Sequence, residues 1–303
     1  MTNATITLAP LAETLRIFRP APNIIAFYDG RVPGVRAYAA GPNWLDDGAY
    51  ALGVCTYAIL DGADALVYDT HISVKHAGII RDTLVKAGAR TIRVVLSHWH
   101  LDHIAGNAVF ADCEMIAHRW TLDAMIQHKA AIEAGTHHGL PAIAPLIMPM
   151  TLYDDEMDLM VGAIPVSLRH VDIHSRDGTM LLLPEQELLL AGDALEDSVT
   201  YVAEPEGFEN HLRDLARMRW WQIASILPNH GAPERIAAGG YDKGLITATQ
   251  LYVERLLDCR RSDVLRAQSL AQFVADEVER GWIGYFEPYE AVHRGNIEKV
   301  MGL

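Results

Sequence analysis

The strongest constraint on the fold is a histidine-rich segment that directly follows an apolar, strand-like run. Residues 91–96 predict a buried strand, and the pattern His-x-His-x-Asp-His follows it at His98, His100, Asp102 and His103. Side chains alternate on an extended backbone, so the first two histidines are expected on the same side. The last two ligand candidates come where the chain turns toward a helix and therefore diverge from this pair. Since imidazole and carboxylate both suit zinc, one loop can offer two ligands to one ion and two to a neighbour.

Length and composition indicate a globular protein. At 303 residues, half of them hydrophobic and 21% charged, the chain can bury a large core. We expect a single domain over residues 1–303, with a core at about 20–240 and a helical extension at about 241–303. The predicted helices of this extension cover about 245–259, 264–278 and 289–300. Whether they cover a pocket or form a homodimer interface is left open by the sequence.

Charge and cysteine content restrict the partners and the compartment. The formal net charge of -14 argues against a nucleic-acid surface, where clustered Lys and Arg are expected. No uncharged apolar run reaches the roughly 18 residues of a membrane-spanning helix, and the N-terminal residues do not resemble a signal peptide. The three cysteines form no paired motif, as is typical of a reducing compartment. We therefore expect a cytoplasmic protein whose partner is a small-molecule substrate.

Strand-like and helix-like runs alternate along the first 230 residues. A hairpin is predicted from residues 56–60 and 65–68, and a second from 180–183 and 188–191. A helix is expected from an N-cap at Ser73 to Gly88. Residues 41–53 look like a loop, and residues 136–150 look like an inserted loop or lid. The histidines at 118, 128, 137 and 138 in or near this lid region are interpreted as helix or loop residues.

Three further candidates for metal ligands follow later strand-like runs. His174, Asp193 and His230 each come at the end of such a run. A single His or Asp at a strand end is most often a cap or a loop residue. Together with the first segment, however, they supply His or Asp at four strand ends in chain order, which is what a metal site at a sheet edge requires.

This pattern resembles the metallo-β-lactamase superfamily over about residues 20–235. The resemblance implies an αββα four-layer sandwich with, here, a C-terminal helical extension. It also implies that His98, His100 and His174 hold one metal ion, that Asp102, His103 and His230 hold a second, and that Asp193 bridges both. Asp69 matches a family Asp that supports the site from behind the ligands.

The implied chemistry is hydrolysis by two zinc ions, with iron or manganese as alternative metals. Two ions about 3.5–4 Å apart can hold a bridging hydroxide at neutral pH. Enzymes that hydrolyse β-lactams have Cys or Ser at the step of Asp193, whereas lactonases, glyoxalase II-type thioesterases and phosphodiesterases have Asp. The resemblance therefore favours a small ester, lactone or thioester as substrate. Asp102 and Tyr201 are the expected catalytic residues, the tyrosine at a position where lactonases orient the substrate.

Two departures from the family pattern bear on the ligand set. The usual Pro-Gly-His before the third ligand is replaced by Asp172-Ile173-His174, and His170 lies four residues earlier as a competing ligand. The usual Asp-Thr-Gly becomes Asp69-Thr70-His71, where the histidine could reach the pocket, cap the chain or be exposed.

Other functions share this fold or this ligand set. A mononuclear iron enzyme of the persulfide-dioxygenase type and a phosphodiesterase or nuclease are the enzymatic alternatives. A metal-stabilised binding protein is the non-enzymatic one. It is disfavoured because structural zinc sites are usually closed and Cys-rich.

Overall fold

The computed structural model describes residues 7–302 and divides the chain into two units, Met1–Pro165 and Val166–Leu303. The boundary falls within strand β11 (Ile164–Ile173). The expectation of one domain stays a prediction, and each unit is described by itself. Within residues 7–302, no helix combines the length and the apolar character needed to cross a membrane.

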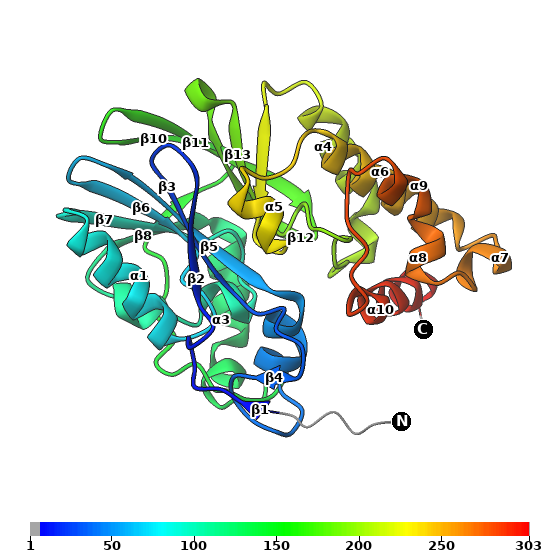
Figure 1. Ribbon diagram of the computed structural model, residues 1–303, viewed down its shortest axis with the longest axis horizontal. Helices are drawn as coiled ribbons and strands as arrows, with labels where there is room; N and C mark the ends of the chain where they lie inside the picture. The colour runs from blue at the N-terminus through cyan, green and yellow to red at the C-terminus, as the bar shows by residue number, and fades with distance from the viewer. Residues whose placement is uncertain (1–6, 303) are drawn as a thin grey trace. The chain divides into compact units, whose positions relative to one another are not determined.

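A seven-stranded mixed sheet is the framework of the first unit (Figure 1). Its strands, in spatial order, are β2 (Arg16–Ala21), β3 (Ile24–Asp29), β5 (Val54–Asp61), β6 (Asp64–Tyr68), β7 (Thr91–Val95), β8 (Glu114–His118) and β9 (Thr151–Tyr153). The first four pair antiparallel, and the predicted hairpin of β5 and β6 is confirmed. From β6 to β9 the pairing is parallel. Consequently the carboxyl ends of β6 and β7 meet at one edge of this sheet.

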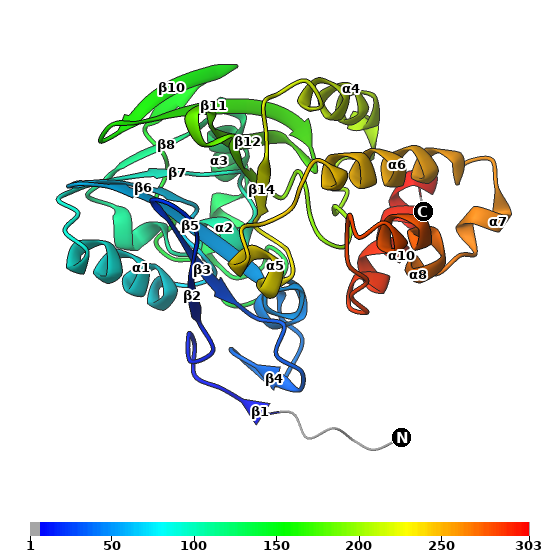
Figure 2. The ribbon, with the colours of Figure 1, turned by 45° about the horizontal axis from the view of Figure 1, so that its top comes forward.

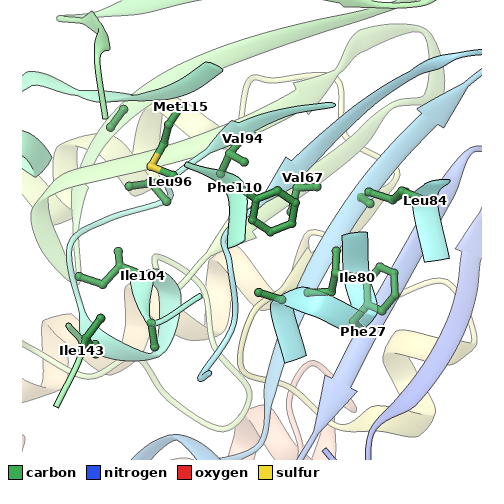
Figure 3. Close-up of a cluster of buried hydrophobic side chains, with 14 of the residues drawn as sticks. Phe27, Val67, Ile80, Leu84, Val94, Leu96, Ile104, Phe110, Met115 and Ile143 are labelled. Carbon is green, nitrogen blue, oxygen red and sulfur yellow. The ribbon is translucent and has the colours of Figure 1, made fainter. Parts of the chain in front are cut away.

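Helices pack on an apolar face of this sheet. They are α1 (Val74–Lys86), α2 (Leu101–Ile104) and α3 (Arg119–Glu133). The predicted N-cap is confirmed, because the Ser73 hydroxyl accepts from the His76 backbone N–H at the start of α1. Figure 3 shows Ile80 and Leu84 of α1 beside Phe27 and Val67 of the strands, all fully buried. Burial of such side chains stabilises the layer by about 1.5–3 kcal/mol each.

The segment predicted as a loop at residues 41–53 contains a π-helical turn, Leu45–Tyr50 (η1). The prediction was wrong there because a side chain organises the backbone. The buried Asp46 carboxylate accepts from the backbone N–H groups of Ala37, Tyr38 and Ala39. Elements not predicted in this unit are β1 (Thr7–Leu8), β2, β4 (Val35–Arg36), η2 (Asn107–Phe110), β9 and β10 (Glu156–Val161).

In the second unit, strands β11, β12 (Ser175–Leu183), β13 (Leu188–Gly192) and β14 (Ser225–Pro228) pair in that order. The predicted hairpin of β12 and β13 is confirmed, with the turn η3 (Pro184–Gln186) between them. Strands β13 and β14 are parallel. The carboxyl end of β13 therefore lies beside the carboxyl end of β14 and the start of β12.

Helices make up the rest of the second unit. They are η4 (Pro205–Gly207), α4 (Phe208–Met218), α5 (Pro233–Ala237), α6 (Gly244–Asp258), α7 (Asp263–Arg266), α8 (Leu270–Phe273), α9 (Ala275–Glu279) and α10 (Tyr289–Met301). The predicted extension is present, and Figures 1 and 2 show α10 beside α6 and α8. The single helix predicted at 264–278 is instead three short ones. A capping box formed by Ser269 and Gln272 begins the second of these helices and so separates it from the first.

Candidate metal centre

Parallel strands bring the first group of predicted residues to one edge of the seven-stranded sheet. Asp69 follows β6 directly, and the segment from Ser97 to His103 follows β7. The Asp69 carboxylate accepts from the Ser97 backbone N–H at 2.6 Å and from its hydroxyl at 2.7 Å. Asp69 is fully buried and has φ of +70°, in the left-handed region. This fixed carboxylate is the anchor of the histidine segment.

His98 and His100 offer their ring nitrogens to a common point. The distance from His98 Nε2 to His100 Nδ1 is 3.0 Å, and the rings meet edge to face. The Ser97 hydroxyl lies 2.9 Å from Nδ1 of His98 and holds that imidazole from behind. Two donors of a tetrahedral zinc ion, each at 2.0–2.1 Å from the metal, lie about 3.3 Å apart. The observed separation is therefore suitable for two ligands of one ion.

His103 and Asp102 form a second pair of donors. Nε2 of His103 lies 3.4 Å from Oδ2 of Asp102, again the separation expected for two ligands of one ion. Nδ1 of His103 is 2.8 Å from Oδ2 of Asp69. A carboxylate that accepts at Nδ1 keeps the proton there and leaves Nε2 free to bind a metal. Asp69 thus contacts a predicted ligand from the rear, as the resemblance implies.

The structure buries His71 completely, so the exposed role left open by the sequence does not occur. Its φ is +67°, which agrees with the glycine found at this step in the family pattern. Nδ1 accepts from the Ile72 backbone N–H, and the ring stacks on His76 at 4.3 Å. Burial, then the neighbouring His76 and His103, hold the pKa of His71 well below its usual range. This imidazole is therefore neutral at pH 7.

The histidines of the lid region lie against one another and against Trp99. The Trp99 ring stacks on His128 at 4.6 Å and lies 5.2 Å from His137. Burial, then the nearby His138 and His128, lower the pKa of His137 to about 4. His118 instead caps α3 by accepting from the Trp120 backbone N–H. None of these contacts among the described residues assembles a further three-ligand cluster.

The second unit gathers His174, Asp193 and His230 at one edge of its own sheet. Asp193 follows β13, His230 follows β14, and His174 occupies the turn between β11 and β12 with φ of +70°. One carboxylate oxygen, Oδ2 of Asp193, lies 3.8 Å from Nε2 of His174 and 3.2 Å from Nε2 of His230. All three side chains are buried. These separations again suit donors of a shared ion.

The competing ligand candidate His170 has a different role. It lies on β11, and its Nε2 is 2.7 Å from the Arg176 carbonyl oxygen at the exposed side of the hairpin. His174 lies four residues later and faces Asp193. The geometry therefore favours His174 as the ligand.

Glu196 is a site residue that the sequence did not indicate. Its side chain is 2% exposed, and its Oε1 lies 3.5 Å from Nδ1 of His174. With His174 and Asp193 it makes up a group of three donors within 4.8 Å of one another. Tyr201 lies close by, its ring 5.7 Å from that of His174 and its backbone N–H bonded to Glu196. An acidic residue three positions after Asp193 was the available signal, and it is a weak one.

Comparisons with known proteins identify the family of the chain. The model of the metallo-beta-lactamase superfamily matches residues 50–224, more than half of the chain. The atrochrysone carboxyl ACP thioesterase of Cryptosporiopsis sp. (strain 8999) is 24% identical over 230 residues. That match covers 66% of this chain and 65% of the relative, slightly less than two thirds of its length.

Solved structures with a similar fold are themselves metallo-β-lactamases. DIM-1 metallo-β-lactamase exposed to ceftazidime has a TM-score of 0.58 and 20% identity, over 82% of this chain and 98% of that one. The metallo-β-lactamase from Pontibacter korlensis has a TM-score of 0.58 and 13% identity, over 79% of this chain and 99% of that one. At such identities the likeness shows the fold alone. It confirms the predicted α/β class, the αββα sandwich.

Proposed function

The chain belongs to the metallo-beta-lactamase superfamily, and we propose that it is a metal-dependent hydrolase that uses two zinc ions to hydrolyse a small ester, lactone or thioester. The observation that carries this proposal is the position of Asp193. One of its oxygens faces the Nε2 atoms of both His174 and His230. A carboxylate shared by two histidines suits a ligand common to two ions.

The assignment of ligands to ions follows the family pattern. The first ion takes His98, His100 and His174, the second takes Asp102, His103 and His230, and Asp193 bridges them. Donor separations of 3.0 and 3.4 Å in the first unit and of 3.2 and 3.8 Å in the second support this assignment. The absence of cysteine from the set suits zinc in a catalytic rather than a structural role.

When bound, the ions supply a water of lowered pKa and positive charge for the substrate's carbonyl oxygen. The chain itself supplies orientation. Asp69 fixes the proton of His103 on Nδ1, and the Ser97 hydroxyl holds His98 at its Nδ1. Asp102 adds negative charge that offsets the charge of the metal. Tyr201 is proposed to donate its phenol O–H to the carbonyl oxygen and so orient the substrate.

An ester, lactone or thioester is favoured over a β-lactam or a phosphodiester for three reasons. Lactonases and glyoxalase II-type enzymes of the family carry Asp at the step of Asp193. The relative from Cryptosporiopsis is described as an acyl-carrier-protein thioesterase, which adds weight to the thioester. The net charge of -14 disfavours a polyanionic nucleic acid as substrate.

Location and assembly remain proposals. All three cysteines, Cys55, Cys113 and Cys259, are free thiols, which supports the cytoplasm or another reducing compartment. Burial raises the pKa of Cys55 to about 12, so this thiol is inert. A homodimer stays an expectation to be tested by the mass of the protein in solution.

The test is the metal content of the purified protein, followed by turnover of a panel of thioesters, lactones, aryl esters and bis-p-nitrophenyl phosphate. We expect zinc in the protein and activity on at least one carbonyl substrate, abolished by a chelator and restored by zinc. One iron per chain with oxygen consumption would instead establish the dioxygenase alternative. Cleavage of the phosphodiester alone would establish the nuclease alternative.

A further inference from the structure

Glu196 lies between the proposed ligand His174 and the last helix of the chain. Its Oε1 faces Nδ1 of His174 at 3.5 Å and accepts from the Tyr201 backbone N–H at 2.8 Å. Its Oε2 accepts from the hydroxyl of Tyr289, the first residue of α10, at 3.0 Å. Both Glu196 and Tyr289 are buried. A chain of contacts therefore runs from the C-terminal extension to the imidazole.

The geometry distinguishes a supporting role for Glu196 from a role as a metal ligand. Nε2 of His174 faces Asp193, whereas Nδ1 of the same ring faces Glu196. Both oxygens of Glu196 already accept hydrogen bonds from the chain. A carboxylate at Nδ1 holds the proton there and fixes the orientation of the ring, so that Nε2 points to the ion. Glu196 thus faces His174 from the same side of the ring as Asp69 faces His103, at 3.5 Å instead of the hydrogen-bond distance of 2.8 Å.

The next residue makes a second connection of the same kind. Asp197 donates its backbone N–H to the carbonyl oxygen of His230 at 3.1 Å. Its buried carboxylate accepts from the Tyr241 hydroxyl and from the Gly284 backbone N–H, each at 2.6 Å. Burial, then the charge of Asp197, raise the pKa of Tyr241, so that this hydroxyl stays protonated and donates. Two adjacent acids therefore connect both histidine loops of the second unit to segments that come later in the chain.

The loop after Asp193 receives further support from α10. Asn296 accepts from the Val202 backbone N–H and donates to the Thr200 carbonyl oxygen, both at 2.9 Å. Lys299 donates to the Val202 carbonyl oxygen and lies 3.6 Å from the centre of the Tyr201 ring. In Figure 2, α10 is the red helix beside α6 and α8. All of these residues belong to the second unit.

We propose that Tyr289 and Glu196 are positioning residues, through which helix α10 sets the orientation of the His174 imidazole for metal binding. His174 occupies the turn between β11 and β12 with a backbone φ of +70°, a conformation uncommon for residues other than glycine. The C-terminal extension is then part of the metal centre's support. This inference rests on the proposed function, since it takes His174 to be a metal ligand.

The experiment compares zinc affinity in full-length variants by competition with a chromophoric chelator. We expect Glu196→Gln to weaken zinc binding about 10- to 100-fold, the range for groups that orient a ligand. Tyr289→Phe, which keeps the ring and removes only the hydroxyl, should weaken binding about tenfold. Both should shift the visible spectrum of the cobalt-substituted protein. The matched control is Tyr285→Phe, whose exposed hydroxyl donates to Glu290 and which should bind zinc as the wild type does.

The outcomes separate this inference from the proposed function. Wild-type affinity and spectrum in Tyr289→Phe, even with a lower melting temperature, would reduce the contact to a structural one and overturn the proposal. Loss of a whole ion in Glu196→Gln alone would make Glu196 a ligand and overturn it as well. If His174→Ala binds as much zinc as the wild type, the proposed function fails first. Should Glu196→Gln not fold, Tyr289→Phe decides.

Discussion

Replacement of Asp69 by Asn isolates the charge of the carboxylate behind His103. Asn tolerates the left-handed backbone that this position adopts at φ of +70°, and it has nearly the same volume. The carboxylate accepts from the Ser97 N–H, the Ser97 hydroxyl and Nδ1 of His103, at 2.6, 2.7 and 2.8 Å. An amide has one oxygen for these three donors. Its N–H₂ group would also face Nδ1 of His103 and favour the wrong tautomer.

The expected loss of zinc affinity follows from the loss of the hydrogen bond between the Asp69 carboxylate and Nδ1 of His103. A hydrogen bond to a charged group contributes about 1.5–3 kcal/mol. If this free energy no longer stabilises the metal-binding tautomer of His103, the affinity for zinc falls roughly 10- to 150-fold, at about 1.4 kcal/mol per tenfold. We therefore expect Asp69→Asn to weaken zinc binding by one to two orders of magnitude.

The assay is chelator competition on the metal-free protein, with unfolding by denaturant as the parallel measure of stability. The matched control is Asp46→Asn, because Asp46 is also a buried carboxylate that accepts from several backbone N–H groups. This control should lose stability but keep zinc affinity. If Asp69→Asn and Asp46→Asn lose stability alike while both keep wild-type zinc affinity, the tautomer argument is refuted.

Three further predictions address individual residues. Tyr201→Phe should lower kcat/KM about three- to tenfold, the worth of one neutral hydrogen bond, without loss of zinc in a metal analysis. His174→Ala should lose zinc while His170→Gln keeps it, as the same analysis would reveal. Burial lowers the pKa of His293 from 6.5 to about 4. Between these two pH values, this imidazole is mostly protonated in the unfolded chain and mostly neutral in the folded protein. The free energy of unfolding therefore keeps its full value above about pH 6.5 and falls by roughly 3 kcal/mol as the pH is lowered to 4. His293→Gln should flatten this fall in denaturant unfolding of the metal-free protein at several pH values.

The sequence allowed prediction of those residues that follow strands. Asp193 and His230 come directly after apolar runs, and parallel pairing of β13 and β14 brings such positions to one edge. The same reasoning applies to Asp69 and His103 after β6 and β7. A strand pattern and a change to polar residues are local signals, so no tertiary contact had to be known.

Residues whose role depends on distant contacts were not predicted. The role of Glu196 depends on its hydrogen bond from Tyr289, which lies 93 positions later in the chain. The π-helical turn at Leu45–Tyr50 depends on hydrogen bonds that the Asp46 carboxylate accepts from backbone N–H groups of a preceding segment. Burial of His71 was also left open, because its sequence neighbourhood permits a cap or an exposed loop. These features arise from tertiary packing, which composition and periodicity do not encode.

The central claim is that this donor set holds two zinc ions that serve hydrolysis. The most direct measurement titrates zinc into the metal-free protein and records turnover of the best carbonyl substrate against ions bound per chain. The account predicts that activity develops fully only at two ions per chain, and that Asp193→Ala breaks this relation. Full activity at one ion, or turnover that does not follow zinc at all, would contradict it.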